Sequence, residues 1–184
     1  MQKITERHSA PITIISEVQK ALSYYPDLQD VSITFKFKDK LSTSVMKAQP
    51  TWATLFNGKK KRAYIILISR NLQIDGQKFD IHEIPKEVLI GWLGHELGHV
   101  MDYRCRSTIN LIIFGLAYLI SGKHIKNAER EADVFAVKAG MQDYILATKN
   151  FILNHSSLSD KYKARIKKFY LSPEEIMHLV KQQS

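Results

Sequence analysis

Residues 92–101 read Trp-Leu-Gly-His-Glu-Leu-Gly-His-Val-Met, and this stretch decides what the chain can build. The surrounding sequence predicts one helix from Pro85, a favourable first helical residue, through about Tyr103. His95 and His99 are four positions apart in it, so their side chains lie on one helical face about one turn from each other. Both imidazole rings can therefore reach a single metal ion.

Glu96 follows the first of these histidines, so its carboxylate points beside the shared metal position rather than at it. A general base needs this position to take a proton from a metal-bound water. For Zn2+, two histidines and a water leave the tetrahedral shell one ligand short. A carboxylate from elsewhere in the chain is therefore expected to complete it.

The run Asn127-Ala-Glu-Arg-Glu-Ala-Asp133 offers this carboxylate at the start of a second predicted helix, which begins near Asn127 and stops at Gly140. Glu129 and Asp133 share one face of that helix. Glu129 is the expected third metal ligand. Asp133 is expected to accept the second N–H of a ligand histidine and so to fix the orientation of its ring.

Both features also have a metal-free interpretation, which the residues alone leave open. Two histidines on a half-buried helix can satisfy their ring nitrogens with backbone carbonyls. An acidic residue such as Glu129 is also favourable near a helix N-terminus for electrostatic reasons alone. The two features together, in this order, favour the metal site.

The remaining sequence predicts an α+β fold: one domain, residues 1–184, with a small antiparallel sheet, then the histidine-bearing helix and a mostly helical C-terminal half. The pairs Asn57-Gly58 and Asp75-Gly76 predict turns, the first of them a hairpin. Predicted strands occupy residues 31–37, part of 42–56 with Pro50 at a bend or an edge, and 64–69, whereas further helices occupy 11–25, 108–120, 142–154, 158–169 and 173–182.

Composition narrows the class of protein. The chain is 45% hydrophobic and 24% charged, as in ordinary globular proteins, and its one cysteine, Cys105, cannot form an internal disulfide. With no secretory signal recognisable at the charged N-terminus, these features predict a cytoplasmic protein. The net charge of +9 makes nucleic acid and anionic membranes conceivable partners. The basic clusters at 59–62 and 161–168 contain no nucleic-acid motif and are interpreted as solvated faces.

The longest apolar stretch, residues 109–120, has two interpretations. As a helix it would be about 18 Å long, short of the roughly 30 Å hydrocarbon core of a bilayer, so it cannot span a membrane alone. It is either a buried helix of the core or an apolar flap that touches lipid or an apolar substrate. Peripheral membrane contact through this stretch therefore stays open.

His-Glu-Leu-Gly-His followed by Glu-Arg-Glu-Ala-Asp resembles the gluzincin metallopeptidases of the HtpX type, and the chain length resembles that of their compact relatives, the minigluzincins. The resemblance covers about 64–169 and implies a zincin-like domain that binds one Zn2+ through His95, His99 and Glu129. It also implies that Glu96 is the base and Asp133 the partner of a ligand histidine. In this family an edge strand pairs with an extended peptide substrate, and the segment 64–69 stands at the corresponding place.

A third segment, Asn154-His-Ser-Ser-Leu-Ser-Asp160, resembles the family's Thr-His-Pro stretch, with Ser156 in place of the proline. The resemblance makes His155 a candidate donor to the oxyanion that forms during hydrolysis. A polar residue that merely flanks a helix explains His155 equally well. Three tyrosines are rival donors: Tyr144, Tyr162 and Tyr170.

We therefore expect a zinc-dependent endopeptidase in which Glu96 activates the water that attacks a peptide or protein substrate. One alternative is a zinc-loaded but latent protein whose C-terminal helix, residues 173–182, fills the cleft. The other is a basic module that binds anionic membrane or nucleic acid without catalysis.

Overall fold

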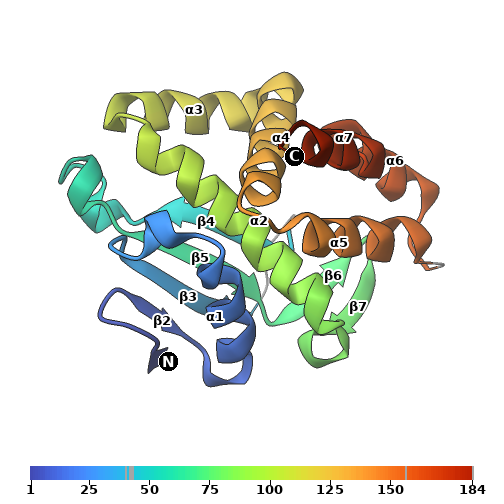
Figure 1. Ribbon diagram of the computed structural model, residues 1–184, viewed down its shortest axis with the longest axis horizontal. Coiled ribbons are helices and arrows are strands. Elements are labelled where there is room, and N and C mark those ends of the chain that lie inside the picture. Colours follow the sequence, from blue (N-terminus) through green and yellow to red (C-terminus); the bar gives the residue numbers. More distant parts are fainter. Residues whose placement is uncertain (40, 42–43, 156, 184) are drawn as a thin grey trace.

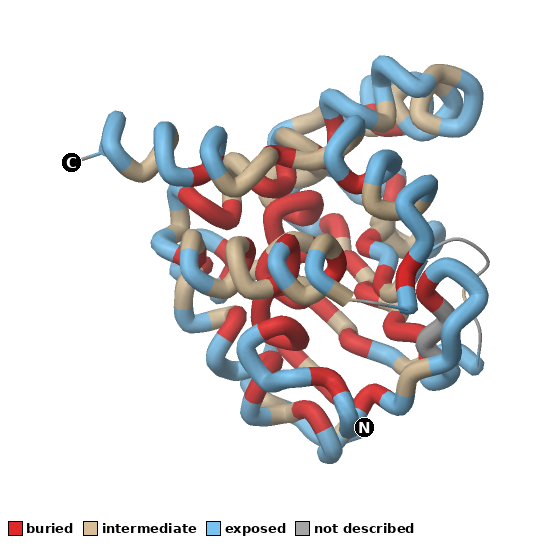
Figure 2. Tube along the Cα trace, turned by 90° about the vertical axis from the view of Figure 1, so that its right-hand side faces the viewer, coloured by how far each residue is buried: buried red, intermediate tan, exposed pale blue. Residues whose placement is uncertain are grey.

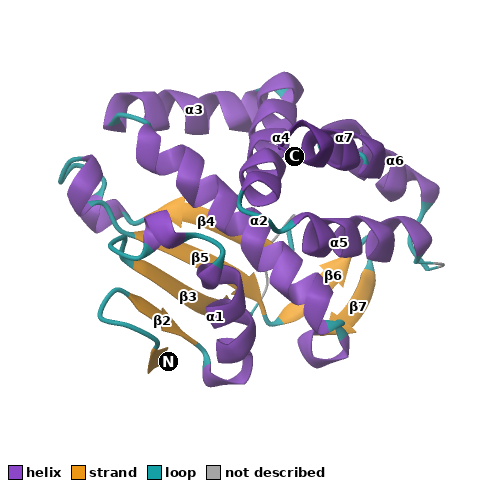
Figure 3. Ribbon diagram, viewed as in Figure 1, coloured by secondary structure: helices purple, strands orange, loops and turns teal. Residues whose placement is uncertain are grey.

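The computed structural model describes residues 1–39, 41, 44–155 and 157–183. A five-stranded sheet forms one side of the molecule, two helices cover one of its faces, and the remaining helices pack beyond them (Figures 1 and 3). The α+β class expected from the sequence is confirmed. The sheet itself is mixed, so the expectation of an antiparallel sheet is wrong.

The five strands lie in the order β1-β2-β3-β5-β4, with β2, β3 and β5 parallel and the two outer strands antiparallel to their neighbours. The strands are β1 (Gln2–Lys3), β2 (His8–Ala10), β3 (Ile33–Lys38), β4 (Met46–Pro50) and β5 (Tyr64–Ser69). A second, two-stranded sheet pairs β6 (Asn71–Ile74) with β7 (Gln77–Asp80). The predicted turn at Asp75-Gly76 joins these two strands, and both turn residues have positive φ.

The expectation that residues 64–69 form an edge strand is wrong. β5 lies inside the sheet, paired with β3 on one side and β4 on the other, and β4 forms the edge. The composition agrees with this order. β5 is apolar from Tyr64 through Ile68, as a strand with neighbours on both sides requires, whereas β4 carries Lys47 and ends at Pro50, which has no N–H to give a ladder.

The Asn57-Gly58 pair lies in the connection from β4 to β5, but it does not close a tight hairpin. Residues 51–63 form a longer loop with two short 3-10 turns, Trp52–Thr54 and Lys59–Lys61, and Gly58 has a φ of 78° between them. Buried Arg62 fixes the loop, because its guanidinium donates to the carbonyls of Tyr103 and Arg106.

Seven α-helices occur among the described residues. They are α1 (Ile15–Ser23), α2 (Lys86–Cys105), α3 (Thr108–Ile120), α4 (Gly122–Lys138), α5 (Gln142–Asn154), α6 (Asp160–Phe169) and α7 (Pro173–Gln183). The predicted start near Asn127 is wrong, since α4 begins at Gly122. Ser121 alone separates α3 from α4, and its extended backbone bends the chain there by 117°.

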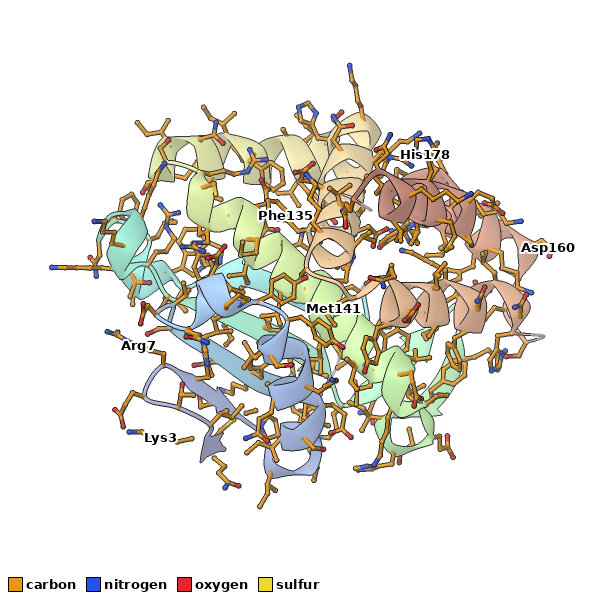
Figure 4. The ribbon with its side chains drawn as sticks, in the orientation of Figure 1. Lys3, Arg7, Phe135, Met141, Asp160 and His178 are labelled. Carbon is orange, nitrogen blue, oxygen red and sulfur yellow. The ribbon has the colours of Figure 1, made fainter. Side chains whose placement is uncertain are left out.

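α2 is the central element of the core. Its buried side chains face the sheet and α1 on one side and α4 and α5 on the other. Figure 2 shows that the buried residues gather in the interior of the molecule and the exposed ones around it. Glycines on α2 permit this close packing. A Cβ at Gly91 would meet the carbonyl oxygen of Tyr144 on α5, and one at Gly94 would meet the side chain of Met141, which lies against α2 in Figure 4.

α3 is not a buried helix, so the interpretation of residues 109–120 as part of the core is wrong. Leu111 is its one buried residue, and most of its other large apolar side chains face outward. No single helix in the described part of the chain is long and apolar enough to cross a membrane. Only the bent pair α3 and α4, taken together, reaches that length and hydropathy.

Candidate metal centre

Two imidazole rings meet at the middle of α2. His95 and His99 are one helical turn apart, and their ring centroids are 4.8 Å apart in an edge-to-face arrangement. The apolar neighbours Leu93, Leu97 and Val100 are fully buried and anchor this part of α2 in the core. The rings are therefore held by helix packing, as the four-residue spacing predicts.

Glu129 reaches the two rings from α4, the helix that packs against α2. Its Oε2 lies 3.1 Å from His95 Nε2 and 3.6 Å from His99 Nε2. One ligand atom from each of the three residues lies within 4.8 Å of the others, although the side chains are only 13%, 8% and 7% exposed for His95, His99 and Glu129. The predicted set of three is therefore brought together in one buried place.

Gly98 sets the distance between the two helices. A Cβ built on it would lie 2.4 Å from the carbonyl oxygen of Ala132 on α4, closer than real contacts allow. Glu129 lies one turn before Ala132, so the separation that Gly98 permits also fixes how near the carboxylate comes to the histidines.

We expect Gly98→Ala to weaken the metal centre, because the added methyl group pushes α4 away from α2. Overpacking should cost about 1–3 kcal/mol of unfolding free energy in spite of the better helix propensity of alanine. Zinc affinity should fall about 10- to 100-fold, as when a supporting contact is lost. Urea unfolding and calorimetric titration with zinc measure the two effects.

Gly115→Ala on α3 is the matched control, because no atom lies within 4 Å of a Cβ there. This variant should keep its zinc affinity and gain up to about 1 kcal/mol in stability. Equal zinc affinities for the two variants would contradict the role given to Gly98.

Asp133 orients His95. Its Oδ1 lies 2.9 Å from His95 Nδ1, while Lys149 Nζ on α5 lies 2.8 Å from Oδ2 and the backbone N–H of Leu171 donates to the same oxygen. Burial disfavours the carboxylate, but the charge of Lys149 and the bond with His95 hold the pKa of Asp133 below its usual range. An ionised carboxylate can only accept, so Nδ1 of His95 carries the proton.

With Nδ1 of His95 bonded to Asp133, Nε2 is the ring nitrogen that faces Oε2 of Glu129, 3.1 Å away. Burial opposes a charge on His95, yet its bonds to Asp133 and Glu129 outweigh burial and raise the pKa of the ring to about 10. Burial likewise opposes ionisation of Glu129, but bonds with both histidines hold its pKa well below the usual range. The place where the three residues meet favours positive charge, so they fit a metal cation.

His99 is held differently from His95. Its ring stacks on Tyr103 with centroids 5.7 Å apart and planes inclined by 21°. Its Nδ1 is buried, and among the described side chains and backbone groups no hydrogen-bond partner reaches it. Packing against Tyr103, rather than a carboxylate, therefore orients this second ring.

Glu96 connects the metal centre to the sheet. Its Oε2 accepts a hydrogen bond of 2.6 Å from the backbone N–H of Ala48 on β4. Burial raises the pKa of its carboxyl group, and the neighbouring histidines act against this shift. Glu96 is therefore a buried carboxyl group that adjoins both histidines and is bonded to the edge strand.

Two tyrosines cover the centre. The hydroxyl of Tyr118 on α3 donates to Glu129 Oε1 at 2.5 Å, and the ring of Tyr170, which follows α6, lies 5.6 Å from that of His95. Tyr170 was among the rival donors of the sequence analysis, but Tyr118 was missed. Its one sequence signal is that it carries the sole hydroxyl in the apolar run 109–120.

The other proposed donors lie elsewhere. The ring of His155 packs against Phe79 and Phe151, and its Nδ1 is bonded to Ser157. Within the described part of the chain its contacts do not reach the histidines of α2. Tyr144 packs on Tyr24, and Tyr162 belongs to a second hydrophobic cluster around Ile74 and Ile166.

The C-terminal helix α7 lies beside α4, the helix that carries Glu129. α7 packs against α4 and α5, and Glu175 at its start pairs with Arg130 of α4. The groove between α4 and α7, about 580 Å3, is lined by residues such as Asn127 and His178 and by none of the metal-ligand candidates. A capping box starts α7, because the carboxylate of Glu175 accepts from the backbone N–H of Ser172 and the hydroxyl of Ser172 accepts from that of Glu175.

Comparisons of the chain with protein-family models, curated proteins and solved structures find no match. The similarity to HtpX-type gluzincins therefore remains a prediction from two motifs.

Proposed function

We propose that this chain is a zinc-dependent endopeptidase, with His95, His99 and Glu129 as the metal ligands and Glu96 as the general base. The observation that carries the proposal is the convergence of these three ligand atoms within 4.8 Å, with Glu96 bonded to the adjacent edge strand. A histidine pair with a purely structural role would not require a buried glutamate, Glu96, that is bonded to the edge strand of the sheet.

Zinc is the metal that this donor set suits best. Two imidazole nitrogens and one carboxylate oxygen match the His2Glu composition of catalytic zinc sites, in which the fourth position stays open. An all-oxygen set would instead favour magnesium or calcium. When bound, zinc would supply a Lewis acid that polarises a carbonyl and lowers the pKa of water.

β4 is the strand that supports substrate binding in this proposal, in place of β5. The backbone groups of its odd-numbered residues, such as Lys47 and Gln49, bond to β5, so the carbonyl groups of Met46, Ala48 and Pro50 point to the open edge, where the N–H of Ala48 is bonded to Glu96. An extended peptide can add to this edge through main-chain hydrogen bonds without regard to its sequence. The peptide would then run past Glu96, which Ala48 holds in place.

The chain's own groups then have defined tasks. Glu96 accepts a proton from the attacking water and delivers it to the leaving amine nitrogen, and its raised pKa suits both directions of transfer. Asp133 keeps His95 in one tautomer and one orientation. Burial raises the pKa of Tyr170 well above its ordinary value, so the hydroxyl remains a donor that can stabilise negative charge on the substrate oxygen.

Metal content together with peptide cleavage tests the proposal. The purified protein should hold a single zinc ion per chain, a chelator should stop cleavage of an unstructured protein such as casein, and added zinc should restore it. His95→Ala should lose both the metal and the activity, because two ligands hold zinc far more weakly than three. Elemental analysis and a cleavage assay give the two readouts.

His178 is an exposed histidine on α7, and its replacement in His178→Ala is the control. This variant should keep both the metal and the activity. Absence of metal from protein purified without chelator and then offered zinc would end the proposal. A second outcome is also informative: the unaltered protein binds zinc, His95→Ala does not, and neither the full chain nor a chain without α7 cleaves peptides. The protein would then bind metal without being a peptidase.

A further inference from the structure

The outward face of α3 is apolar along its whole length. Its exposed large side chains recur at helical spacing and form what we call the apolar stripe. The stripe consists of Ile109, Ile112, Ile113, Leu116, Leu119 and Ile120, which are between 42% and 87% exposed. Isolated exposed apolar residues are ordinary, but a continuous row on one helix is typical of a surface that contacts something else.

The loop between β4 and β5 extends this surface. It carries Trp52 and Phe56, which are 77% and 74% exposed. The loop is attached to the start of α3, because Thr108 donates to the carbonyl oxygen of Leu55 at 2.9 Å. In Figure 1 this loop lies beside the first turn of α3, at the outer edge of the molecule. The loop that carries the two exposed aromatic side chains therefore adjoins the apolar stripe.

The charges around this face all have one sign. Residues 51–63 and 103–128 contain no aspartate or glutamate. Exposed Lys59, Lys60 and Lys61 lie at one end of the apolar stripe, and exposed Lys123 and Lys126 lie at the other, in the first turns of α4. The ammonium group of Lys59 donates to the carbonyl of Cys105, which keeps the first cluster next to α3.

An apolar stripe with lysines at both ends indicates which kind of partner can cover this face. Two copies of the chain that paired through the apolar stripe would bring lysines against lysines in either orientation. An anionic lipid surface instead offers hydrocarbon for the apolar residues and negative headgroups for the lysines at both ends. An exposed tryptophan suits the boundary between the two regions of a bilayer.

We propose that α3 and the 51–63 loop form a docking surface for an anionic bilayer, with α3 lying in the plane of the headgroups. No single helix among the described residues is long and apolar enough to span a bilayer, and the chain bends by 117° after α3, so the proposal places the protein on the membrane surface. The inference does not depend on the proposed peptidase activity, since it uses none of the metal-binding residues.

The test is flotation with vesicles of phosphatidylcholine and phosphatidylserine in a seven-to-three ratio, compared with vesicles of phosphatidylcholine alone. The protein should float with the first, and binding should weaken as salt is raised. Lys59/Lys60/Lys61→Gln should bind about 100-fold more weakly, from a factor of about five for each lysine. Leu116→Glu should bind at least about tenfold more weakly.

Two matched controls use other parts of the surface. Lys161/Lys167/Lys168→Gln removes the same charge from α6, and Met177→Glu places an acid at an exposed apolar residue of α7. Both should bind like the unaltered protein. Fluorescence adds a direct readout: in Trp92→Phe, which retains Trp52 alone, the emission should shift to the blue only with the anionic vesicles.

Each opposite outcome overturns the inference. Failure to float, equal binding to both kinds of vesicle, or an equal loss in the α6 triple variant would show that this face does not recognise an anionic bilayer. Sedimentation velocity tests the other possible occupant of this face, a second copy of the chain. A dimer that Leu116→Glu separates, without vesicle binding, would assign the apolar stripe to contact between two copies.

Discussion

Replacing Glu96 by glutamine should lower the rate of peptide cleavage about 100- to 10,000-fold and leave the zinc in place. Glutamine keeps the size of the side chain and can still accept the hydrogen bond from Ala48, but it cannot take up the proton of the attacking water. The loss should appear in kcat more than in KM, because the proton moves only as the reaction proceeds. Cleavage kinetics and elemental analysis on the same preparation measure both properties.

Glu87→Gln makes the same chemical change at an exposed position in the first turn of α2 and should leave kcat unchanged. If Glu96→Gln cleaved as fast as Glu87→Gln, Glu96 would not be the base. If Glu96→Gln lost its zinc, the carboxylate would instead serve to hold the centre together.

Asp133→Asn should destabilise the protein by about 3–5 kcal/mol in urea unfolding with a chelator present. Both Asp133 and Lys149 are buried, and the ammonium group of Lys149 lies 2.8 Å from the carboxylate. Asparagine keeps the shape of the side chain but removes the negative charge, so the positive charge of Lys149 remains in the interior without compensation. The chelator ensures that altered metal binding does not enter the measurement.

A second variant separates charge from packing. Asp133→Asn combined with Lys149→Met removes both charges and should recover a large part of the lost stability, since a missing buried pair costs less than a broken one. Glu6→Gln breaks an exposed ion pair with Lys3 and should show no measurable change. Equal losses in the single and double variants would mean that the hydrogen bonds of Asp133, and not its charge, maintain the fold.

The candidate metal ligands could be predicted because their relations are local. The spacing from His95 to His99 fixes their common face in any helix, and the spacing from Glu129 to Asp133 does the same on the next helix. That α2 and α4 pack against each other did not follow from spacing. This packing was inferred from the number of ligands that zinc needs. In the structure it depends on Gly98, because a side chain there would collide with Ala132 of α4, a contact that the sequence does not show.

The errors concern relations between distant segments. The sequence shows that residues 64–69 form a strand but not which strands flank it. β5 lies between β3 and β4, although β3 and β4 follow one another in the chain. The exposure of α3 was unpredictable for the same reason, since an apolar run has the same composition in a core and on a docking surface. Tyr118 approaches Glu129 because the chain bends at Ser121, and the spacing of apolar residues along the sequence does not predict such a bend.

The hydrogen bonds of Asp133 also bear on how the protein matures on the ribosome. This carboxylate holds His95 while it is itself held by Lys149 and by the backbone of Leu171, far downstream. During synthesis the two histidines and Glu129 leave the ribosome before Lys149 and Leu171 do. A nascent chain can therefore bring the three candidate ligands together early, but it fixes the ring of His95 only when most of the polypeptide is available to fold.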